Sequence, residues 1–236
     1  MTAPRNERLT IAVGANHRVS GLYERPRAAR AVFVLAHGAG AGMEHPSMQA
    51  LATALGEHGI ATLRYQFPYM EQKSRRPDPP ALCHATVRAA VAEGARLAPD
   101  LPLIAAGRSF GGRMTSQAQA QAPLQGVRGL VFLAFPLHPA GRPATDRAAH
   151  LQEVRIPMLF VQGSRDELAE LALLRPVVEQ LGSRANLCVL QEADHSFHVP
   201  ARSGRKEADV REEALQAVCA WLDPLEGTPS QAGLPT

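Results

Sequence analysis

The sequence predicts an α/β fold: one mostly parallel sheet of about seven to eight strands, with helices on both faces and no lid domain. Short apolar runs alternate along the chain with segments whose apolar residues have helical spacing, which is typical of a parallel sheet covered on both sides. The chain has 236 residues, 45% of them apolar and 20% charged, which suits one large core. We therefore expect a single domain over 1–223 and a disordered tail over 224–236, where Pro, Gly, Ser and Thr are frequent.

The expected strands are short runs of apolar and β-branched residues. The first two, Leu9–Val13 and Val19–Glu24, flank a Gly/Asn/His turn and predict an antiparallel hairpin at the sheet edge. The remaining strands are expected at Ala31–Ala36, Ile60–Tyr65, Leu101–Ala106, Val127–Phe135, Pro157–Gln162 and Leu187–Gln191.

The expected helices lie between these strands, at Pro46–His58, Ala81–Leu97, Phe110–Gln121, Leu168–Leu181 and Glu207–Leu222. Gly59 ends the first, and Pro176 should break or kink the fourth. The Pro-rich stretch Pro68–Pro80 predicts a polar loop. The loop Leu137–Ile156 has room for a helical turn or two around Asp146–Leu151 but not for a separate lid.

Composition argues against several functional classes. The three cysteines, Cys83, Cys188 and Cys219, include no CxxC pair, so we expect reduced thiols and a cytoplasmic location. The first ten residues contain no apolar block, which predicts no secretory signal, and no apolar run is long enough to span a membrane. The net charge is +3 and the arginines are scattered, so no nucleic-acid partner is expected. Metal-ligand and nucleotide-binding motifs are missing, so no metal or other cofactor is expected.

The motif that carries chemistry is Gly107-Arg108-Ser109-Phe110-Gly111, a G-x-S-x-G sequence. It follows an apolar strand and precedes a helix-compatible segment, which is the strand–turn–helix context that this motif requires. Such a turn exposes the serine hydroxyl, and the small glycines avoid clashes with the neighbouring strand and helix. We predict that Ser109 is a nucleophile; the alternative is a Gly-rich turn without chemistry.

A serine nucleophile needs a base and an acid that orients the base, and in this architecture the acid precedes the histidine in the chain. Asp166 follows the strand Pro157–Gln162, and His195 follows the strand Leu187–Gln191. Both sit where open α/β sheets place ligand sites, beyond the carboxyl ends of strands. Glu167 and His198 are the competing acid and base, and we favour Asp166 and His195 because they lie nearer the strand ends.

Two backbone N–H groups should form an oxyanion hole. One is expected at Phe110, directly after the nucleophile. The other should come from the small-residue loop His37-Gly38-Ala39-Gly40-Ala41-Gly42, with Ala39 as first choice and Gly40 as second. For His37 we favour a structural role in this loop over a catalytic one.

Other polar or aromatic residues fall in loops near the expected site. Arginines there suit a carboxylate- or phosphate-bearing substrate, although we favour the simpler explanation that this chain uses Arg in place of Lys throughout. Phe135, at a strand end, is assigned evenly to pocket or core. The candidates for substrate contact are His37, Arg108, Phe135, His138 and Arg142.

Several stretches together resemble the α/β-hydrolase superfamily, and within it a family of small lidless proteins related to dienelactone hydrolases. They are LAHGAGAGMEHPSM, RYQFPYMEQKSRRPDPP, GRSFGGRM, FPLHPAGRP, LFVQGSRDE and ADHSFHVP, spread over about 30–222. The resemblance implies the α/β-hydrolase fold and a Ser109–Asp166–His195 triad. Dienelactone hydrolases use a cysteine where this chain has Ser109, so their substrate is not implied. Distant relatives in this group include a subunit of a chromatin-acetylating complex.

These observations predict a serine hydrolase, a carboxylesterase acting on a small-molecule acyl substrate of small to medium size. One alternative is an interaction module that keeps the fold with little or no turnover. Another is an acyltransferase or perhydrolase that uses the same serine. A homo-oligomer is expected only by analogy with other hydrolases of this architecture.

Overall fold

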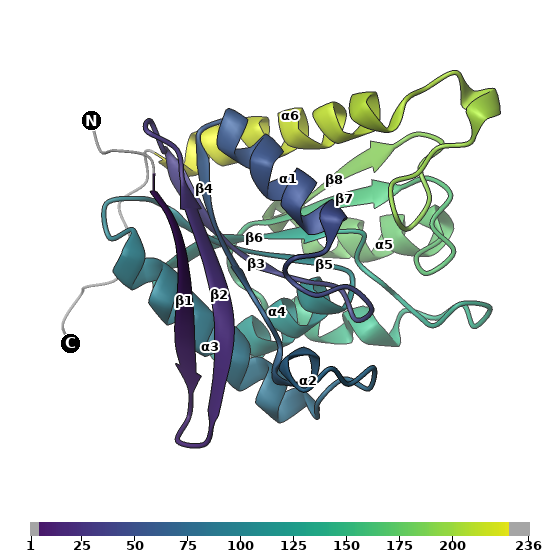
Figure 1. Cartoon of the computed structure of the whole chain (residues 1–236). Helices are drawn as coiled ribbons and strands as arrows, with labels where there is room; N and C mark the ends of the chain where they lie inside the picture. The colour runs from purple at the N-terminus through teal and green to yellow at the C-terminus, as the bar shows by residue number, and fades with distance from the viewer. Residues whose placement is uncertain (1–4, 227–236) are drawn as a thin grey trace.

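The computed structural model describes residues 5–226 and shows an eight-stranded sheet with helices on both faces (Figure 1). The strand order is β1-β2-β4-β3-β5-β6-β7-β8. The β1–β2 and β2–β4 pairs are antiparallel, and all other neighbours are parallel. The mostly parallel sheet and its antiparallel edge hairpin are therefore as the sequence predicts.

The strands of the sheet are β1 (Arg5–Val13), β2 (His17–Arg25), β3 (Ala31–Ala36), β4 (Ile60–Tyr65), β5 (Leu103–Arg108), β6 (Val127–Leu133), β7 (Met158–Gly163) and β8 (Ala185–Leu190). β5 begins two residues later than predicted, because the Leu101 N–H is used in a turn to the Ala98 carbonyl and Pro102 has no N–H. The central strands β3 and β4 are buried along their whole length, as continuous apolar runs in parallel sheets are.

The α-helices are α1 (Pro46–Glu57), α2 (Pro68–Glu71), α3 (Pro80–Leu97), α4 (Phe110–Gln121), α5 (Leu171–Leu181) and α6 (Glu207–Glu226). Three 3₁₀ segments join them, η1 (Asp146–Glu153), η2 (Gly182–Arg184) and η3 (Ala201–Ser203). η1 provides the helical turns expected in the loop before β7.

Three predictions about these elements are corrected. The stretch expected as a loop contains α2, which starts with Pro68 at its first position, where proline's missing N–H costs nothing. α5 begins at Leu171 instead of Leu168, and it continues through Pro176 without a break. α6 extends through Pro224 to Glu226, so the predicted disordered tail starts too early. The rest of that tail, 227–236, lies outside the described residues.

Two apolar cores fill the layers on either side of the sheet. One joins the sheet to α3, α4, α5 and η1, for example through Val87, Met114 and Leu174. The other joins it to α1 and α6, through Leu55 and Leu215 among others. Figure 1 shows these two helix layers above and below the sheet. Within the described residues, no helix combines the length and the apolar character needed to cross a membrane.

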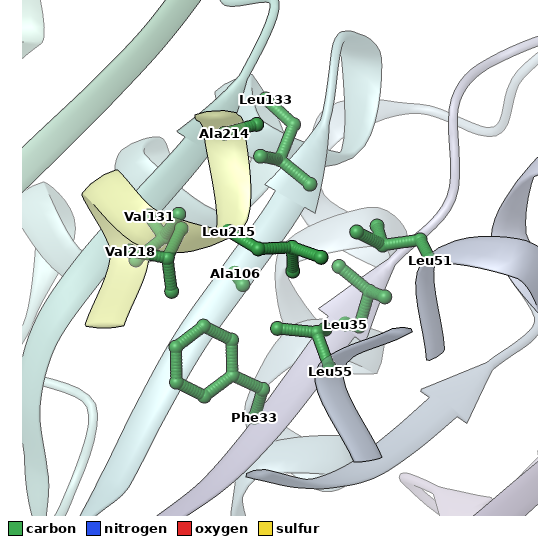
Figure 2. Close-up of a pocket in the computed structure, with 10 residues that line it drawn as sticks. All are labelled: Phe33, Leu35, Leu51, Leu55, Ala106, Val131, Leu133, Ala214, Leu215 and Val218. Atoms are coloured by element: carbon green, nitrogen blue, oxygen red, sulfur yellow. The ribbon is translucent and has the colours of Figure 1, made fainter. Parts of the chain in front are cut away.

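A small cavity lies between α1, α6 and the sheet (Figure 2). Its volume is about 10 Å³, roughly the space of one water molecule. Every side chain that lines it is apolar, so it offers no polar group to hold a ligand. The lining residues are Phe33, Leu35, Leu51, Leu55, Ala106, Val131, Leu133, Ala214, Leu215 and Val218.

The order of the strands reverses at β3, because β4 lies on one side of it and β5 on the other. Open α/β sheets bind ligands beyond the carboxyl ends of the strands at such a reversal. The loop that starts at His37 follows β3, and Ser109 follows β5. The fold thus brings the two sequence motifs to one point on the rim of the sheet.

Candidate active site

Ser109 occupies a sharp turn between β5 and α4. Its φ of 48° and ψ of −115° are strained for a residue with a side chain. The turn is held from both sides: the Ser109 N–H donates to the Leu133 carbonyl at 2.9 Å, and the Ser109 carbonyl accepts from the Arg113 N–H at 3.1 Å. The backbone hydrogen bonds therefore fix where the Ser109 hydroxyl stands.

The glycines around Ser109 let α4 approach the sheet. A Cβ atom at Gly111 would lie 2.5 Å from the His37 carbonyl oxygen and 2.7 Å from that of Ala36. A Cβ atom at Gly112 would lie 2.8 Å from the Gly107 carbonyl oxygen. All of these contacts are with backbone atoms, which cannot move aside as a flexible side chain can. The turn consequently requires glycine at both positions.

A chain of hydrogen bonds runs from Ser109 through His195 to Asp166. Ser109 Oγ lies 2.8 Å from His195 Nε2, and His195 Nδ1 lies 2.7 Å from Asp166 Oδ2. Because the carboxylate can only accept, the imidazole proton belongs on Nδ1. Nε2 then faces the Ser109 hydroxyl as an acceptor. The structure thus brings together the three residues that the sequence singled out.

Asp166 is only 2% exposed, and its carboxylate is satisfied on both oxygens. The Gln162 side-chain amide donates to Oδ2 at 2.5 Å, and the Leu168 N–H donates to Oδ1 at 2.8 Å. The competing residues lie elsewhere: Glu167 is exposed, and the His198 side chain is 62% exposed. Neither has a hydrogen bond to this chain of side chains in the part of the protein that the structure describes.

His195 sits in a loop after β8 that is braced at two points. Asp194 accepts hydrogen bonds from the Ser196 N–H at 2.7 Å and the His198 N–H at 3.0 Å, so its carboxylate caps the turn. The Arg108 guanidinium donates to the His195 carbonyl at 3.1 Å and lies 5.2 Å from the centre of the Phe197 ring. Burial lowers the pKa of Arg108. Arg108 therefore supports the histidine loop, and the predicted substrate contact is not what the structure gives it.

The peptide groups expected to form the oxyanion hole are held by side chains behind them. The His37 Nδ1–H donates to the Gly38 carbonyl at 2.7 Å, which orients the peptide that carries the Ala39 N–H. The Tyr69 hydroxyl donates to the Ala39 carbonyl at 2.9 Å, which orients the peptide that carries the Gly40 N–H. Among the described residues, neither the Ala39 nor the Phe110 N–H has a protein acceptor. Both predicted donors therefore remain available.

His37 is fully buried, and both of its ring nitrogens are used. Nε2 accepts from the Phe67 N–H at 3.0 Å, while Nδ1 donates to Gly38. Burial lowers the pKa of His37 to about 4, so the ring stays neutral at physiological pH. His37 therefore has the structural role that we favoured for it, and the prediction that it contacts substrate is wrong.

Three more predicted substrate contacts do not line the pocket. Phe135, just after β6, is fully buried, and its ring packs in the core against Phe132 and Phe160. His138 is buried and hydrogen-bonded to Glu170 at 2.8 Å. Arg142 is exposed in the loop before η1, and its backbone N–H donates to the Pro139 carbonyl at 3.2 Å.

A pocket of about 400 Å³ opens at Ser109, a size that suits a small-molecule ligand. The two arginines in its lining, Arg113 and Arg147, were not among the residues predicted from the sequence. Arg113 could have been found, because it is one helical turn after Ser109. Arg147 could not, because its position depends on how η1 docks. The lining residues are Ala39, Pro77, Asp78, Pro80, Ser109, Phe110, Arg113, Met114, Pro136, Arg147 and Leu168.

Solved structures with the same fold include several hydrolases. A dienelactone hydrolase from Anabaena variabilis superposes with a TM-score of 0.74 at 22% identity, covering 94% of this chain and 98% of its own. An α/β serine hydrolase homologue from Coxiella burnetii gives 0.72 at 23% identity, with 92% and 99% covered. A serine hydrolase without a lid from Xanthomonas campestris gives 0.71 at 24% identity, with 95% and 97% covered.

The family comparison covers most of the chain. Residues 29–223 match the model of the α/β hydrolase domain, and this span contains every strand from β3 to β8 and all of the site described above. The chain therefore belongs to the α/β-hydrolase domain family.

Proposed function

We propose that this protein is a serine carboxylesterase that hydrolyses esters of small to medium acyl groups. The observation that carries the proposal is the unbroken series of hydrogen bonds from Ser109 Oγ through His195 to Asp166, at 2.8 and 2.7 Å. Hydrogen bonds of this length allow the imidazole to accept the hydroxyl proton as the oxygen attacks.

The proposed reaction has two halves. Ser109 Oγ attacks the ester carbonyl and loses its proton to His195 Nε2, while the Ala39 and Phe110 N–H groups stabilise the oxyanion. The tetrahedral intermediate expels the alcohol, which takes the proton from His195, and an acyl-enzyme remains. Water then gives its proton to His195 and attacks the acyl carbon. The carboxylic acid leaves, and Ser109 regains its proton.

Asp166 contributes by fixing the base. Because its carboxylate is buried and accepts from His195 Nδ1–H, it holds the ring in one tautomer and stabilises the imidazolium that forms in each half. Hydrolysis is favoured over acyl transfer because no lid covers Ser109 within residues 5–226 and the pocket beside it has room for water.

A panel of 4-nitrophenyl esters, from acetate to octanoate, tests this proposal. We expect hydrolysis of the shorter esters, with nitrophenol and free acid released in equal amounts, and a loss of about four orders of magnitude in kcat for Asp166→Asn. If added ethanol or hydrogen peroxide captured most of the acyl group, the protein would be a transferase or perhydrolase. If the folded protein hydrolysed no ester, the alternative of an interaction module with little or no turnover would replace the proposed enzyme function.

A further inference from the structure

Two arginines share the pocket beside Ser109. Arg113 lies on α4, and its N–H bonds to the Ser109 carbonyl at 3.1 Å, so the two residues are one turn apart on the same side of the helix start. Arg147 lies on η1 and lines the same pocket. Over the described part of the chain, neither guanidinium forms an ion pair with a carboxylate.

The structure holds these two residues in place. His150 Nε2 lies 2.7 Å from Ser116 Oγ, which ties η1 to α4 and sets Arg147 beside the pocket. The Arg113 guanidinium lies 5.8 Å from the centre of the Phe110 ring. Its Nε is buried and has no hydrogen-bond partner. A buried donor without an acceptor is destabilising, and a bound anion could supply the missing acceptor.

The groups around the pair do not offset its charge. Asp78 lines the pocket, but its carboxylate accepts from the Tyr69 N–H at 2.7 Å and is not within ion-pair distance of either arginine. Burial lowers the pKa of His150 to about 4, with Arg113 adding to the effect, so this histidine is neutral. Burial, and then the charge of Arg147, lowers the pKa of Arg113. The pocket therefore carries two guanidinium charges, and the Asp78 carboxylate in its lining is hydrogen-bonded to the Tyr69 N–H instead of paired with either of them.

From this arrangement we propose that the substrate is an ester with a second, anionic group, in the simplest case a carboxylate, and that Arg113 and Arg147 bind that group while Ser109 reacts with the ester carbonyl. This inference rests on the proposed function of Ser109. A carboxylate matches the planar donor fork of a guanidinium and accepts two hydrogen bonds from it. Arg113 lies one helical turn after Ser109, about 6 Å along the helix axis, so a half-ester of a short dicarboxylic acid is a suitable probe.

A matched pair of substrates tests the proposal: monomethyl glutarate, and methyl pentanoate, in which a methyl group replaces the carboxylate. The quantity measured is the ratio of the two kcat/KM values, from acid release at low salt. We expect the wild-type protein to prefer the anionic ester at least tenfold, and Arg147→Met to lower this ratio about tenfold, with Arg147→Lys in between. Arg142→Met, on the exposed part of the same loop, should keep the wild-type ratio.

A wild-type ratio of one or less, or a ratio that Arg147→Met and Arg113→Met both leave unchanged, would overturn the inference. A second measurement separates it from the proposed function. Glutarate binding to the Ser109→Ala variant, measured by calorimetry, needs no turnover. If adding Arg147→Met weakens glutarate binding at least tenfold, the anion site is supported even when no ester is hydrolysed. If glutarate does not bind, or if Arg147→Met leaves its binding unchanged, the anion site is contradicted even when neutral esters are hydrolysed.

Discussion

Gln162 donates a hydrogen bond from its side-chain amide to Asp166 Oδ2 at 2.5 Å, the same oxygen that accepts from His195 Nδ1. The Gln162 side-chain oxygen in turn accepts from the Phe135 N–H at 2.9 Å. Gln162 is itself buried at the end of β7. The carboxylate that orients the base is therefore tied to the β6–β7 region of the sheet through one amide side chain.

Replacing Gln162 with Leu should affect both stability and turnover. The change leaves the Phe135 N–H without its acceptor and removes one donor from Asp166, which costs about 2–3 kcal/mol of unfolding free energy. We expect kcat to fall at least tenfold, because the carboxylate loses its fixed orientation. Urea denaturation and steady-state kinetics measure the two effects. An unchanged kcat in a destabilised protein would limit Gln162 to a structural role.

The close contact between α4 and the loop after β3 predicts that Gly111→Ala is strongly destabilising. The new Cβ would meet the His37 and Ala36 carbonyl oxygens at 2.5 and 2.7 Å, so the backbone must move. We expect a loss of about 3 kcal/mol or more in unfolding free energy, or no soluble protein. Gly56→Ala in α1 is the control, because a Cβ added there would meet no other atom within 4 Å, and it should stabilise by about 0.5–1 kcal/mol. Equal stability of the two variants would contradict the packing described.

Arg108 is predicted to act as a positioning residue for His195. Arg108→Met keeps the aliphatic stem but removes the donor to the His195 carbonyl and the contact with Phe197. We expect kcat to fall about tenfold with little change in KM, and Arg108→Lys to recover part of the loss. Arg165→Met, an exposed site in the neighbouring loop, should behave as wild type. If Arg108→Met raised KM and left kcat alone, a substrate contact would be the better assignment.

The buried His37 predicts a loss of stability in acid. Its pKa is about 4 in the folded protein and near 6.5 when unfolded, so the unfolded state binds the proton first. The stabilisation is complete above pH 6.5, declines as the pH falls, and is lost near pH 4, a change of about 3 kcal/mol. Urea denaturation between pH 7 and 4.5 measures the slope.

The control for this pH dependence is a pair of variants. His37→Gln should be less stable than wild type at pH 7 but lose less stability on acidification. His198→Gln removes an exposed ring and should keep the wild-type slope. A His37→Gln slope equal to that of wild type would show that another group causes the acid sensitivity.

Sequence patterns predicted the elements that depend on local signals. The G-x-S-x-G turn, Asp166 and His195 each follow a recognisable apolar strand, so their meeting at one rim follows from the direction of parallel strands. α4 was predicted with its observed bounds because Ser109 and the Gly-rich turn mark its start.

What the sequence did not reveal depends on contacts between distant segments. Arg147 reaches the pocket because η1 is tied to α4 by His150 and Ser116, which are 34 residues apart. Phe135 was assigned evenly to pocket or core, and His138 was a candidate from a loop near the site, yet both side chains are buried. Loop residues have no periodicity that tells which side they face, so their roles needed the fold.

The most direct test of the central claim, that His195 and Asp166 activate Ser109, is intact-mass labelling with a fluorophosphonate. Wild-type protein should gain one stoichiometric adduct. Ser109→Ala should gain none, while it unfolds at a similar urea concentration because the substitution only removes a hydroxyl. Failure of the folded wild-type protein to react, or an adduct that persists in Ser109→Ala, would contradict the assignment of Ser109 as the nucleophile.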